Sequence, residues 1–471
     1  MANFTSPLSD ATLGLPVKNL IKRAPLFVQA GATVAEAAQA MQAARVGSVL
    51  IAGEPPGIIT DRDLRGRVLA ARLGTETSVS EVMTRPVITI NASAPALAAL
   101  RLMIEENIHH LPVTEEGKIV GVVSATDLLI HQGKNPLYLR SVIETLDDSE
   151  RLGNYAEEIG QLANSLFHSG LAALQISQIL SSLNDALVKR LVTLAIAKLG
   201  AAPTQFAWIV FGSEGRLEQA LLTDQDNGLI YRDGSDAAPT YFAALAQQVV
   251  DGLIQVGFPR CPGGYMATNW CKPLAEWQSL FSRWVSLPEP QALLDAAIFF
   301  DFRAVAGDLP LTTLDELIVL AKNEKRFLAQ LAKDALGFHP PLGFFNRLQS
   351  EHGKVDLKKG GIAPIVALAR VAALAAGSRQ RSTLERLAVA AASGAVINRE
   401  SARLLAEIFP ALLQLRLREQ LNNHRANRPI DNSVLLTELS PLERGHLKEA
   451  FGVIKQIQDE LRATWQLDRL A

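Results

Sequence analysis

The stretch that most constrains the fold of this chain is residues 207–231, which read A-W-I-V-F-G-S-E-G-R-L-E-Q-A-L-L-T-D-Q-D-N-G-L-I-Y. Two short apolar runs in it, Trp208–Phe211 and Gly228–Tyr231, each predict a buried strand. Ser213 is a favourable N-cap residue, so we expect a short helix over 214–221. A strand that turns through Gly-Ser into a helix leaves backbone N–H groups free, and these suit a phosphate. The stretch therefore predicts a phosphate-binding turn between two strands.

Two carboxylates lie just before the second predicted strand. If this segment is extended, Asp224 and Asp226 share a face that we expect to point towards the Gly-Ser turn. Adjacent carboxylates repel unless a cation lies between them, and Mg²⁺ (or Mn²⁺) binds carboxylates together with substrate phosphates. We therefore predict that Asp224 and Asp226 are metal ligands. Gly212, Ser213 and Arg216 are the predicted phosphate-binding residues.

The pattern of Gly-Ser, a short helix and Asp-x-Asp resembles the DNA polymerase β-type nucleotidyltransferase superfamily. The longer string G-S-E-G-R-x-E-Q-x-x-x-T-D-Q-D-N resembles one subgroup, bacterial signalling proteins with CBS domains that are related to PII-protein uridylyltransferases. This resemblance implies transfer of a nucleoside monophosphate from an NTP to an acceptor, with Asp224 and Asp226 as catalytic residues. A turn and a hairpin with surface acids is the structural alternative.

A third catalytic carboxylate is not evident in the sequence. In the superfamily it comes from a strand near residues 258–267, where this chain has none, although C-P-G-G-x-M-A matches the subgroup. The next candidate is Asp301, in a string that resembles a helix following the active-site strands of PII uridylyltransferases. The alternative for Asp301 is a structural pair with Arg303. The alternative for Arg216 is a surface charge that pairs along its helix.

An internal repeat lies near the N-terminus. Three pairs of residues recur at one offset: Gly57 and Gly121, Thr60 and Ser124, and Asp63 and Asp127. The shared pattern G-h-h-[ST]-x-x-D, with h apolar, resembles a tandem pair of CBS domains, each ordered helix, strand, turn, strand, helix. The resemblance implies an adenine nucleotide whose ribose contacts Asp63 and Asp127. Thr60 and Ser124 would lie near its phosphate. The same spacing also predicts helix capping boxes, which is the structural alternative.

The predicted fold class is α/β and α+β multidomain. We expect a tandem CBS pair over 17–135, connecting helices over 136–203, and a polymerase β-type nucleotidyltransferase α/β domain over 204–335. An all-helical C-terminal domain over 336–471 resembles the substrate-binding domain of the subgroup. Residues 351–361 are polar and rich in Lys and Gly, and predict a loop that either binds an anion or is solvated.

Composition narrows the class of protein. The net charge of −2 over 471 residues gives no basic field, so no nucleic-acid partner is expected. The two cysteines, Cys261 and Cys271, are too few for a disulfide framework and fit a reducing compartment. We see no signal peptide and no long apolar span, and therefore expect a cytoplasmic protein without membrane contact.

Together these features predict a metal-dependent nucleotidyltransferase. It would transfer a nucleoside monophosphate from an NTP substrate to an acceptor. The acceptor would be a protein, such as a regulatory protein, or a small molecule. Adenine nucleotide at the CBS pair would regulate it, and the CBS pair would form a homodimer. The alternative is a catalytically silent, nucleotide-sensing interaction protein. A glycosyltransferase with an Asp-x-Asp motif is a third class, but the Gly-Ser turn argues against it.

Overall fold

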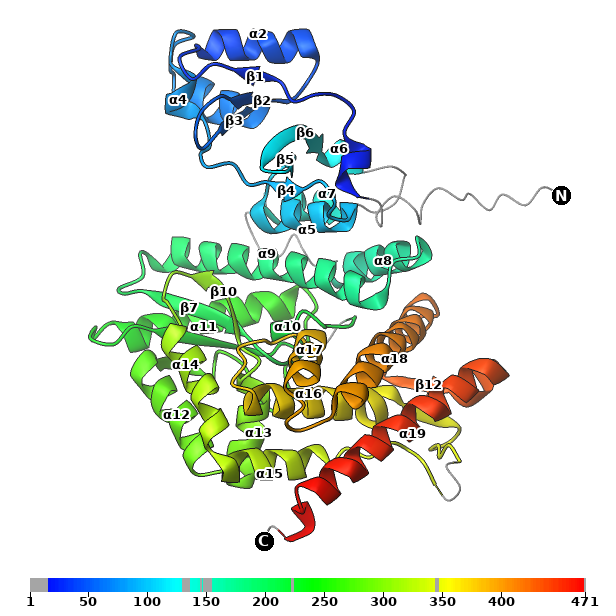
Figure 1. Ribbon diagram of the computed structural model, residues 1–471. Coiled ribbons are helices and arrows are strands. Elements are labelled where there is room, and N and C mark those ends of the chain that lie inside the picture. The colour runs from blue at the N-terminus through cyan, green and yellow to red at the C-terminus, as the bar shows by residue number, and fades with distance from the viewer. Residues whose placement is uncertain are drawn as a thin grey trace, which may run out of the picture. The chain divides into compact units, whose positions relative to one another are not determined.

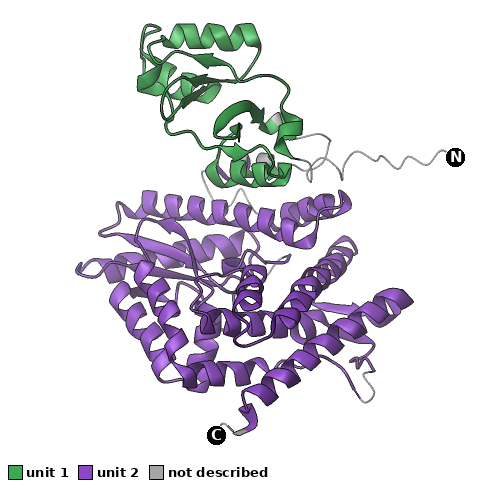
Figure 2. Ribbon diagram, in the orientation of Figure 1, with its two compact units in different colours: residues 1–141 green, residues 142–471 purple. Residues whose placement is uncertain are grey.

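The computed structural model describes residues 16–128, 136–144, 146, 155–221, 224–343 and 347–469. The chain divides into two compact units, residues 1–141 and residues 142–471 (Figure 2). Both units combine helices with sheets (Figure 1), which is the mixed class predicted from the sequence. Within the described ranges, no helix has the length and apolar character needed to cross a membrane.

The first unit contains two copies of one motif. The first copy comprises β1 (Phe27–Val28), α2 (Val34–Ala44), β2 (Ser48–Ile51), β3 (Gly57–Thr60), α3 (Asp61–Asp63) and η2 (Leu64–Leu69). The second comprises β4 (Ile90–Asn91), α5 (Ala96–Glu106), β5 (His110–Glu115), β6 (Lys118–Ser124) and α6 (Ala125–Leu128). In each copy a short strand pairs in parallel with the middle strand, which pairs antiparallel with the last. The repeat predicted from the sequence is confirmed.

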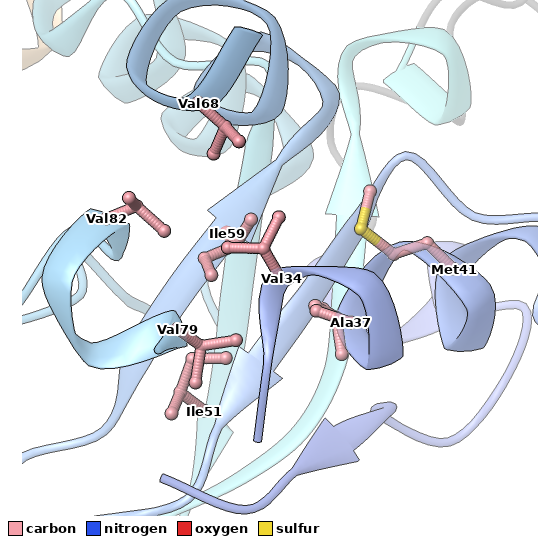
Figure 3. Close-up of a cluster of buried hydrophobic side chains, with 9 residues drawn as sticks. Val34, Ala37, Met41, Ile51, Ile59, Val68, Val79 and Val82 are labelled. Carbon is pink, nitrogen blue, oxygen red and sulfur yellow. The ribbon is translucent and has the colours of Figure 1, made fainter. Parts of the chain in front are cut away.

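The segment that precedes each copy packs on the other copy. η1 (Val17–Leu20) precedes the first copy but contacts α5 and β6 of the second. α4 (Val79–Val82) precedes the second copy but contacts β3 and η2 of the first. Figure 3 shows Val79 and Val82 in the same buried cluster as Ile59 and Val68. The two copies therefore complete each other's cores.

This exchange explains why the repeat keeps a glycine at equivalent positions. A Cβ atom on Gly57 would lie 2.3 Å from Sδ of Met83, which follows α4. A Cβ atom on Gly121 would lie 2.4 Å from a side-chain carbon of Ile21, which follows η1. Each glycine thus makes room for a side chain of the exchanged segment.

A four-stranded sheet lies at the centre of the second unit. Its strands are β7 (Phe206–Val210), β8 (Asn227–Tyr231), β9 (Cys271–Pro273) and β10 (Arg303–Gly307), in the order β10-β7-β8-β9. β7 is antiparallel to β10 and to β8, and β8 is parallel to β9. Every residue of β7 and β8 is buried, as their apolar composition predicts.

Helices surround this sheet in the second unit (Figure 1). Those before and within the sheet region are α8 (Tyr155–His168), α9 (Ala173–Leu199), α10 (Gly212–Gly215), α11 (Ala238–Gln255), α12 (Leu274–Ser286) and α13 (Pro290–Phe299). α7 (Pro136–Glu144) spans the boundary of the two units. α9 packs on α11 and on β10, while α12 contacts β8 and β9. α8 and α9 lie within residues 136–203, where the sequence predicts connecting helices.

The C-terminal part of this unit is mainly helical. Its helices are α14 (Thr312–Leu320), η4 (Ala321–Asn323), α15 (Lys325–Ala335), η6 (Lys358–Ile362), α16 (Ala363–Ala375), α17 (Thr383–Ser393), α18 (Arg399–Arg425), η7 (Leu436–Glu438), α19 (Pro441–Thr464) and η8 (Leu467–Arg469). A small antiparallel sheet joins β11 (Lys354–Asp356) to β12 (Ser433–Leu435). The prediction of a loop over 351–361 is therefore partly wrong, because three of these residues form β11 and pair with β12, which is distant in sequence.

Candidate functional site

The turn after β7 has a different helix start from the one predicted. Phe211 is extended, Gly212 has a φ of +60°, and α10 runs only from Gly212 to Gly215. Ser213 therefore lies inside α10 and is not its N-cap, so the expected helix over 214–221 is wrong. The physical reason is Leu217, whose φ of +60° cannot continue a right-handed helix.

The two predicted metal ligands come close together immediately before β8. β8 begins at Asn227, so Asp224 and Asp226 precede the strand and do not share a strand face as they would in a longer strand. One carboxylate oxygen of each nevertheless lies within 4.8 Å of the other and of Sγ of Cys261. The backbone N–H of Phe211 donates to the carbonyl oxygen of Asp226 at 3.2 Å, which holds the acids beside the turn.

The electrostatics of this acidic pair favour a bound cation. Burial raises the pKa of Asp226 to about 6, and the negative charge of Asp224 adds to the shift. The hydrogen bond from the Cys261 thiol and the positive charge of Lys358 lower the pKa of Asp226, but by less than burial raises it. Two half-buried carboxylates suit Mg²⁺ or Mn²⁺, since oxygen donors are the ligands that these ions prefer. The donor set thus fits a divalent metal, apart from the thiol.

A cavity of about 480 Å³ adjoins the turn and the acids. Gly212, Ser213, Arg216 and Asp226 line one part of it. Helices α13, α15, α16 and α18 contribute an apolar wall that includes Leu293, Ile298, Leu331, Val366, Phe409 and Leu413. A cavity of this volume, apolar with a few convergent polar groups, is typical of a small-molecule site.

Cations from the C-terminal helical part complete the lining. Lys358, Arg370 and Arg416 all reach the cavity. Burial lowers the pKa of the Lys358 ammonium group, while Asp224 and Asp226 pull it upwards. Burial likewise lowers the pKa of Arg416 to about 10, still high enough for a full positive charge at neutral pH. The cavity therefore presents positive charge beside the acidic pair.

Asp301 lies in a different electrostatic setting from Asp224 and Asp226. It is fully buried between three arginines, with oxygen–nitrogen distances of 2.5 Å to Arg216, 2.7 Å to Arg370 and 2.7 Å to Arg386. These guanidinium groups hold the pKa of Asp301 well below its usual range, against the effect of burial. We call Asp301 and its three arginines the Asp301 cluster.

Two sequence interpretations around Asp301 are wrong. The string that contains it is not a helix, because α13 ends at Phe299 and Arg303–Gly307 form β10. The suggested partner, Arg303, instead forms a bidentate pair with Asp185 at 2.5 and 2.9 Å. Asp301 lies in the turn before β10 and pairs with Arg216, Arg370 and Arg386, whereas Arg303 opens β10 and pairs with Asp185 of α9. The catalytic role of Asp301 remains a prediction.

Arg216 is not a surface charge. Its side chain is 10% exposed and pairs with Asp301 and with Glu218 at 2.7 Å. Glu218, in turn, accepts hydrogen bonds from the backbone and hydroxyl of Thr383. Arg216 thus links the turn after β7 to α17 while it lines the cavity, so any contact with phosphate would be made by an arginine already held by two carboxylates.

The predicted ligand residues of the repeat are capping residues in this structure. Oδ2 of Asp63 accepts from the backbone and the hydroxyl of Thr60 at 2.9 and 2.7 Å. Asp127 and Ser124 repeat this arrangement, with a backbone bond of 2.8 Å. The other carboxylate oxygen pairs with a cation in each case, Arg67 for Asp63 and Lys22 for Asp127. The capping alternative is confirmed, and ligand contact remains a prediction.

Comparison with protein families and curated proteins gives the relationship of the first unit. Residues 17–70 and 79–133 match the family described as "CBS domain". The CBS domain-containing protein YhcV of Bacillus subtilis (strain 168) is 31% identical over 121 residues, which cover 25% of this chain and 86% of YhcV. The chain belongs to the CBS domain-containing proteins.

Two further families match the second unit of this CBS domain-containing protein. Residues 157–291 match "Putative nucleotidyltransferase DUF294", and residues 325–465 match "Putative nucleotidyltransferase substrate binding domain". The predicted fold class, a CBS pair followed by a nucleotidyltransferase-like domain and a helical C-terminal domain, is confirmed.

Other relatives of this CBS domain-containing protein match over a quarter of its length. CBSCBSPB2 of Arabidopsis thaliana is 37% identical over 130 residues, which are 27% of this chain and 24% of that protein. An uncharacterized conserved protein from Pyrococcus horikoshii is 33% identical, covering 25% of this chain and 92% of that one, with a TM-score of 0.24. The CBS domain protein PAE2072 from Pyrobaculum aerophilum, solved in complex with AMP, is 27% identical over 25% of this chain and 93% of its own, with a TM-score of 0.24.

Sequence reasoning missed three residues that reach the site. Cys261 opens the string C-P-G-G-x-M-A that matches the subgroup, but nothing in this string indicates that its thiol lies beside the acids. Arg370 is the only charged residue of the apolar stretch 362–376, a signal that it has a buried partner. Arg416 carries no comparable signal, because charged residues are frequent around it in α18.

Replacing Gly215 by alanine is expected to destabilise the second unit by about 1–3 kcal/mol through overpacking. A Cβ atom there would lie 1.9 Å from the carbonyl oxygen of Asp301, so α10 and the turn that precedes β10 would have to separate. The matched control is Gly452→Ala in α19, where nothing lies within 4 Å and alanine should stabilise the helix by up to about 1 kcal/mol. Denaturant midpoints of the two variants would be compared, and equal stability would contradict the close packing.

Proposed function

We propose that residues 142–471 form a metal-dependent nucleotidyltransferase related to PII-protein uridylyltransferases. The observation that carries the proposal is the acidic pair Asp224 and Asp226 beside a cavity with positive charge and an apolar wall. The match of residues 157–291 to "Putative nucleotidyltransferase DUF294" supports it independently. The likeness of the sequence strings to the uridylyltransferases supports the finer relationship.

Different residues of the site would bind different parts of a nucleoside triphosphate and its metal. Asp224 and Asp226 would hold Mg²⁺ or Mn²⁺, which when bound offsets the negative charge of the phosphates and polarises them. Gly212 and Ser213 would contact the phosphates from the turn, where the first N–H groups of a helix have no internal acceptor. Lys358 and Arg416 would neutralise the remaining charge, and the apolar wall would take the nucleoside.

The reaction is transfer of the nucleoside monophosphate. A hydroxyl oxygen of the acceptor would attack the α-phosphorus and lose its proton to solvent, forming a new P–O bond while the bond to the leaving pyrophosphate breaks. The residues of this chain contribute by positioning the triphosphate and by stabilising charge, which are the main means of catalysis in phosphoryl transfer. Since Asp301 is held by three arginines, we propose that it positions Arg216 and does not contact the substrate.

The acceptor is proposed to be a protein or a small molecule bound by the helical C-terminal part, because residues 325–465 match a family described as substrate binding. The direct test is pyrophosphate release from each NTP by the full chain with Mg²⁺ or Mn²⁺, together with transfer of label from the α-phosphate in a cell lysate. Metal-dependent release and a labelled acceptor are the expected results. No release and no labelling with any NTP would overturn the proposal.

A catalytically silent nucleotide-binding protein is the competing proposal. Its supporting observation is that the acidic cluster among the described residues has two carboxylates and a thiol, with no third carboxylate. This alternative predicts NTP binding without pyrophosphate release, so binding by calorimetry and release measured on the same preparation separate the two.

We further propose that the CBS pair binds an adenine nucleotide and regulates the second unit, with a homodimer formed through the CBS pair. The repeated Thr60–Asp63 and Ser124–Asp127 pattern supports ligand binding, and the cations Lys22 and Arg67 beside these aspartates suit a phosphate. Coupling requires that the nucleotide favours one conformation of the chain. By reciprocity, NTP and metal at the second unit would then change adenylate affinity by the factor by which adenylate changes NTP affinity.

Millimolar AMP is expected to raise the melting temperature of the full chain, and Asp63→Ala with Asp127→Ala should abolish that rise. A ligand at a hundred times its dissociation constant stabilises the folded state by about 2.7 kcal/mol. The controls are NTP binding, which should survive in the double variant, and Glu36→Ala. Glu36 belongs to another capping box of the same unit, with Thr33. A rise that persists in the double variant would contradict ligand contact by the two aspartates.

A further inference from the structure

Cys261 occupies a position where a third ligand of the acidic site would be expected. Its Sγ atom lies within 4.8 Å of one carboxylate oxygen of both Asp224 and Asp226. The thiol is 8% exposed and hydrogen-bonds to the Asp226 carboxylate. No other group of three acids, histidines or cysteines within the described ranges is arranged in this way.

The position of the thiol is fixed by the segment that carries the acids. The backbone N–H of Gln225 donates to the carbonyl oxygen of Pro259 at 3.3 Å. The backbone N–H of Asn227 donates to the carbonyl oxygen of Tyr265 at 3.1 Å. The Asn227 side-chain oxygen accepts from the N–H of Ala267 at 2.8 Å. Residues 259–267 are thus tied to both sides of Asp226, which leaves the thiol little freedom to turn away.

Aromatic packing also holds the segment 259–267 in place. Tyr265 stacks on Trp270 with ring centroids 6.0 Å apart and meets the edge of Phe299 at 5.7 Å. Its hydroxyl donates to Asp295 on α13 at 3.1 Å. Gly264 has a φ of +73°, which a non-glycine residue would adopt only with strain. The turn that places Cys261 is therefore built into the core.

We propose that Cys261 is the third protein ligand of the metal, as a thiolate, and that the site binds a borderline-soft cation such as Zn²⁺ or Co²⁺ in preference to Mg²⁺. Binding would replace the S–H bond by a sulfur–metal bond and release the proton to solvent. Thiolates favour zinc-like cations, whereas magnesium takes oxygen donors alone. This inference rests on the proposed metal site but not on turnover.

Titration of the metal-free full chain with Co²⁺ tests the ligand directly. We expect a near-ultraviolet thiolate-to-cobalt charge-transfer band in the unaltered chain and its loss in Cys261→Ser. The chain has two cysteines, so Cys271→Ser leaves Cys261 as the only thiol and should keep the band. Cys271, at the start of β9, lies outside the acidic cluster. This second variant keeps the test decisive even if changes at Cys261 prevent folding.

Competition between cations gives a second readout. Cys261→Asp supplies an oxygen ligand in place of sulfur, and calorimetry is expected to show that the ratio of Zn²⁺ to Mg²⁺ affinity falls by at least ~10–100-fold, the range found for residues that only support a ligand. Co²⁺ binding without the band, a band lost in Cys271→Ser, or an unchanged affinity ratio would overturn the inference. A nucleotidyltransferase that uses Mg²⁺ through its carboxylates would survive each of these results.

Discussion

Replacing Asp226 by asparagine is expected to abolish metal-dependent NTP binding and to reduce any turnover by at least ~10²–10³-fold. The variant removes one of two adjacent negative charges from the site, and the amide that replaces it is a neutral, weaker ligand. Asp224→Asn should have the same effect, because both carboxylates would be needed to hold the cation. Calorimetry with a non-hydrolysable NTP, with and without Mg²⁺, is the measurement.

The folded state is not expected to suffer from these substitutions. Burial raises the pKa of Asp226 to about 6, so the ionised carboxylate is already unfavourable in the absence of metal. The control is Asp236→Asn, an exposed acid after β8 whose replacement should change neither binding nor stability. Unchanged metal-dependent binding in both site variants, with the control behaving alike, would show that the acidic pair does not hold the metal.

Asp301→Asn should lower the free energy of unfolding of the second unit by about 3–5 kcal/mol, the range found when one partner of a buried ion pair is removed. The carboxylate is the shared acceptor of Arg216, Arg370 and Arg386, and the amide would leave these arginines with too little negative charge. Chemical denaturation is the measurement. A variant of full stability that has lost turnover alone would instead support a catalytic Asp301.

A matched control for this variant is Asp315→Asn. Asp315 also pairs with an arginine, Arg381 at 2.6 Å, but its side chain is 32% exposed. We expect a loss of about 1 kcal/mol or less, since water replaces the interaction at such a site. Comparable losses in the two variants would mean that burial does not increase the contribution of the Asp301 cluster to the free energy of unfolding.

The stability difference caused by Asp301→Asn should also depend on pH. Because the folded-state pKa of Asp301 is lowered, its stabilisation is complete above the pKa of the unfolded chain, about 3.9, and is lost as pH falls further towards the folded-state value. The difference between the variant and the unaltered chain should therefore be constant between about pH 5 and pH 8. It should shrink on acidification below about pH 4.

The repeat and the strands beside the Gly-Ser turn could be predicted from sequence because their signals are local. Gly57 and Gly121 recur with their capping residues at one offset, and Trp208–Phe211 is apolar enough to predict burial by itself. The early end of α10 could not be predicted in the same way. It depends on Leu217 adopting a positive φ, which no property of leucine favours.

The electrostatic surroundings of the site were not accessible from sequence for a different reason. Arg216, Arg370 and Arg386 are far apart in the chain and meet at Asp301 only through tertiary packing. Similarly, the proximity of Cys261 to Asp226 arises from backbone bonds between two segments, and spacing alone does not indicate it. Sequence patterns identified the acids, while the groups that modify their chemistry required the fold.

The exchange of η1 and α4 between the two copies of the repeat has a consequence for how the first unit folds. A single copy would have its own sheet and helix but would lack the segment that covers its recurrent glycine, Gly57 or Gly121. Neither copy can therefore complete its core before the other is present. The two copies are expected to gain and lose their structure together, as one cooperative unit.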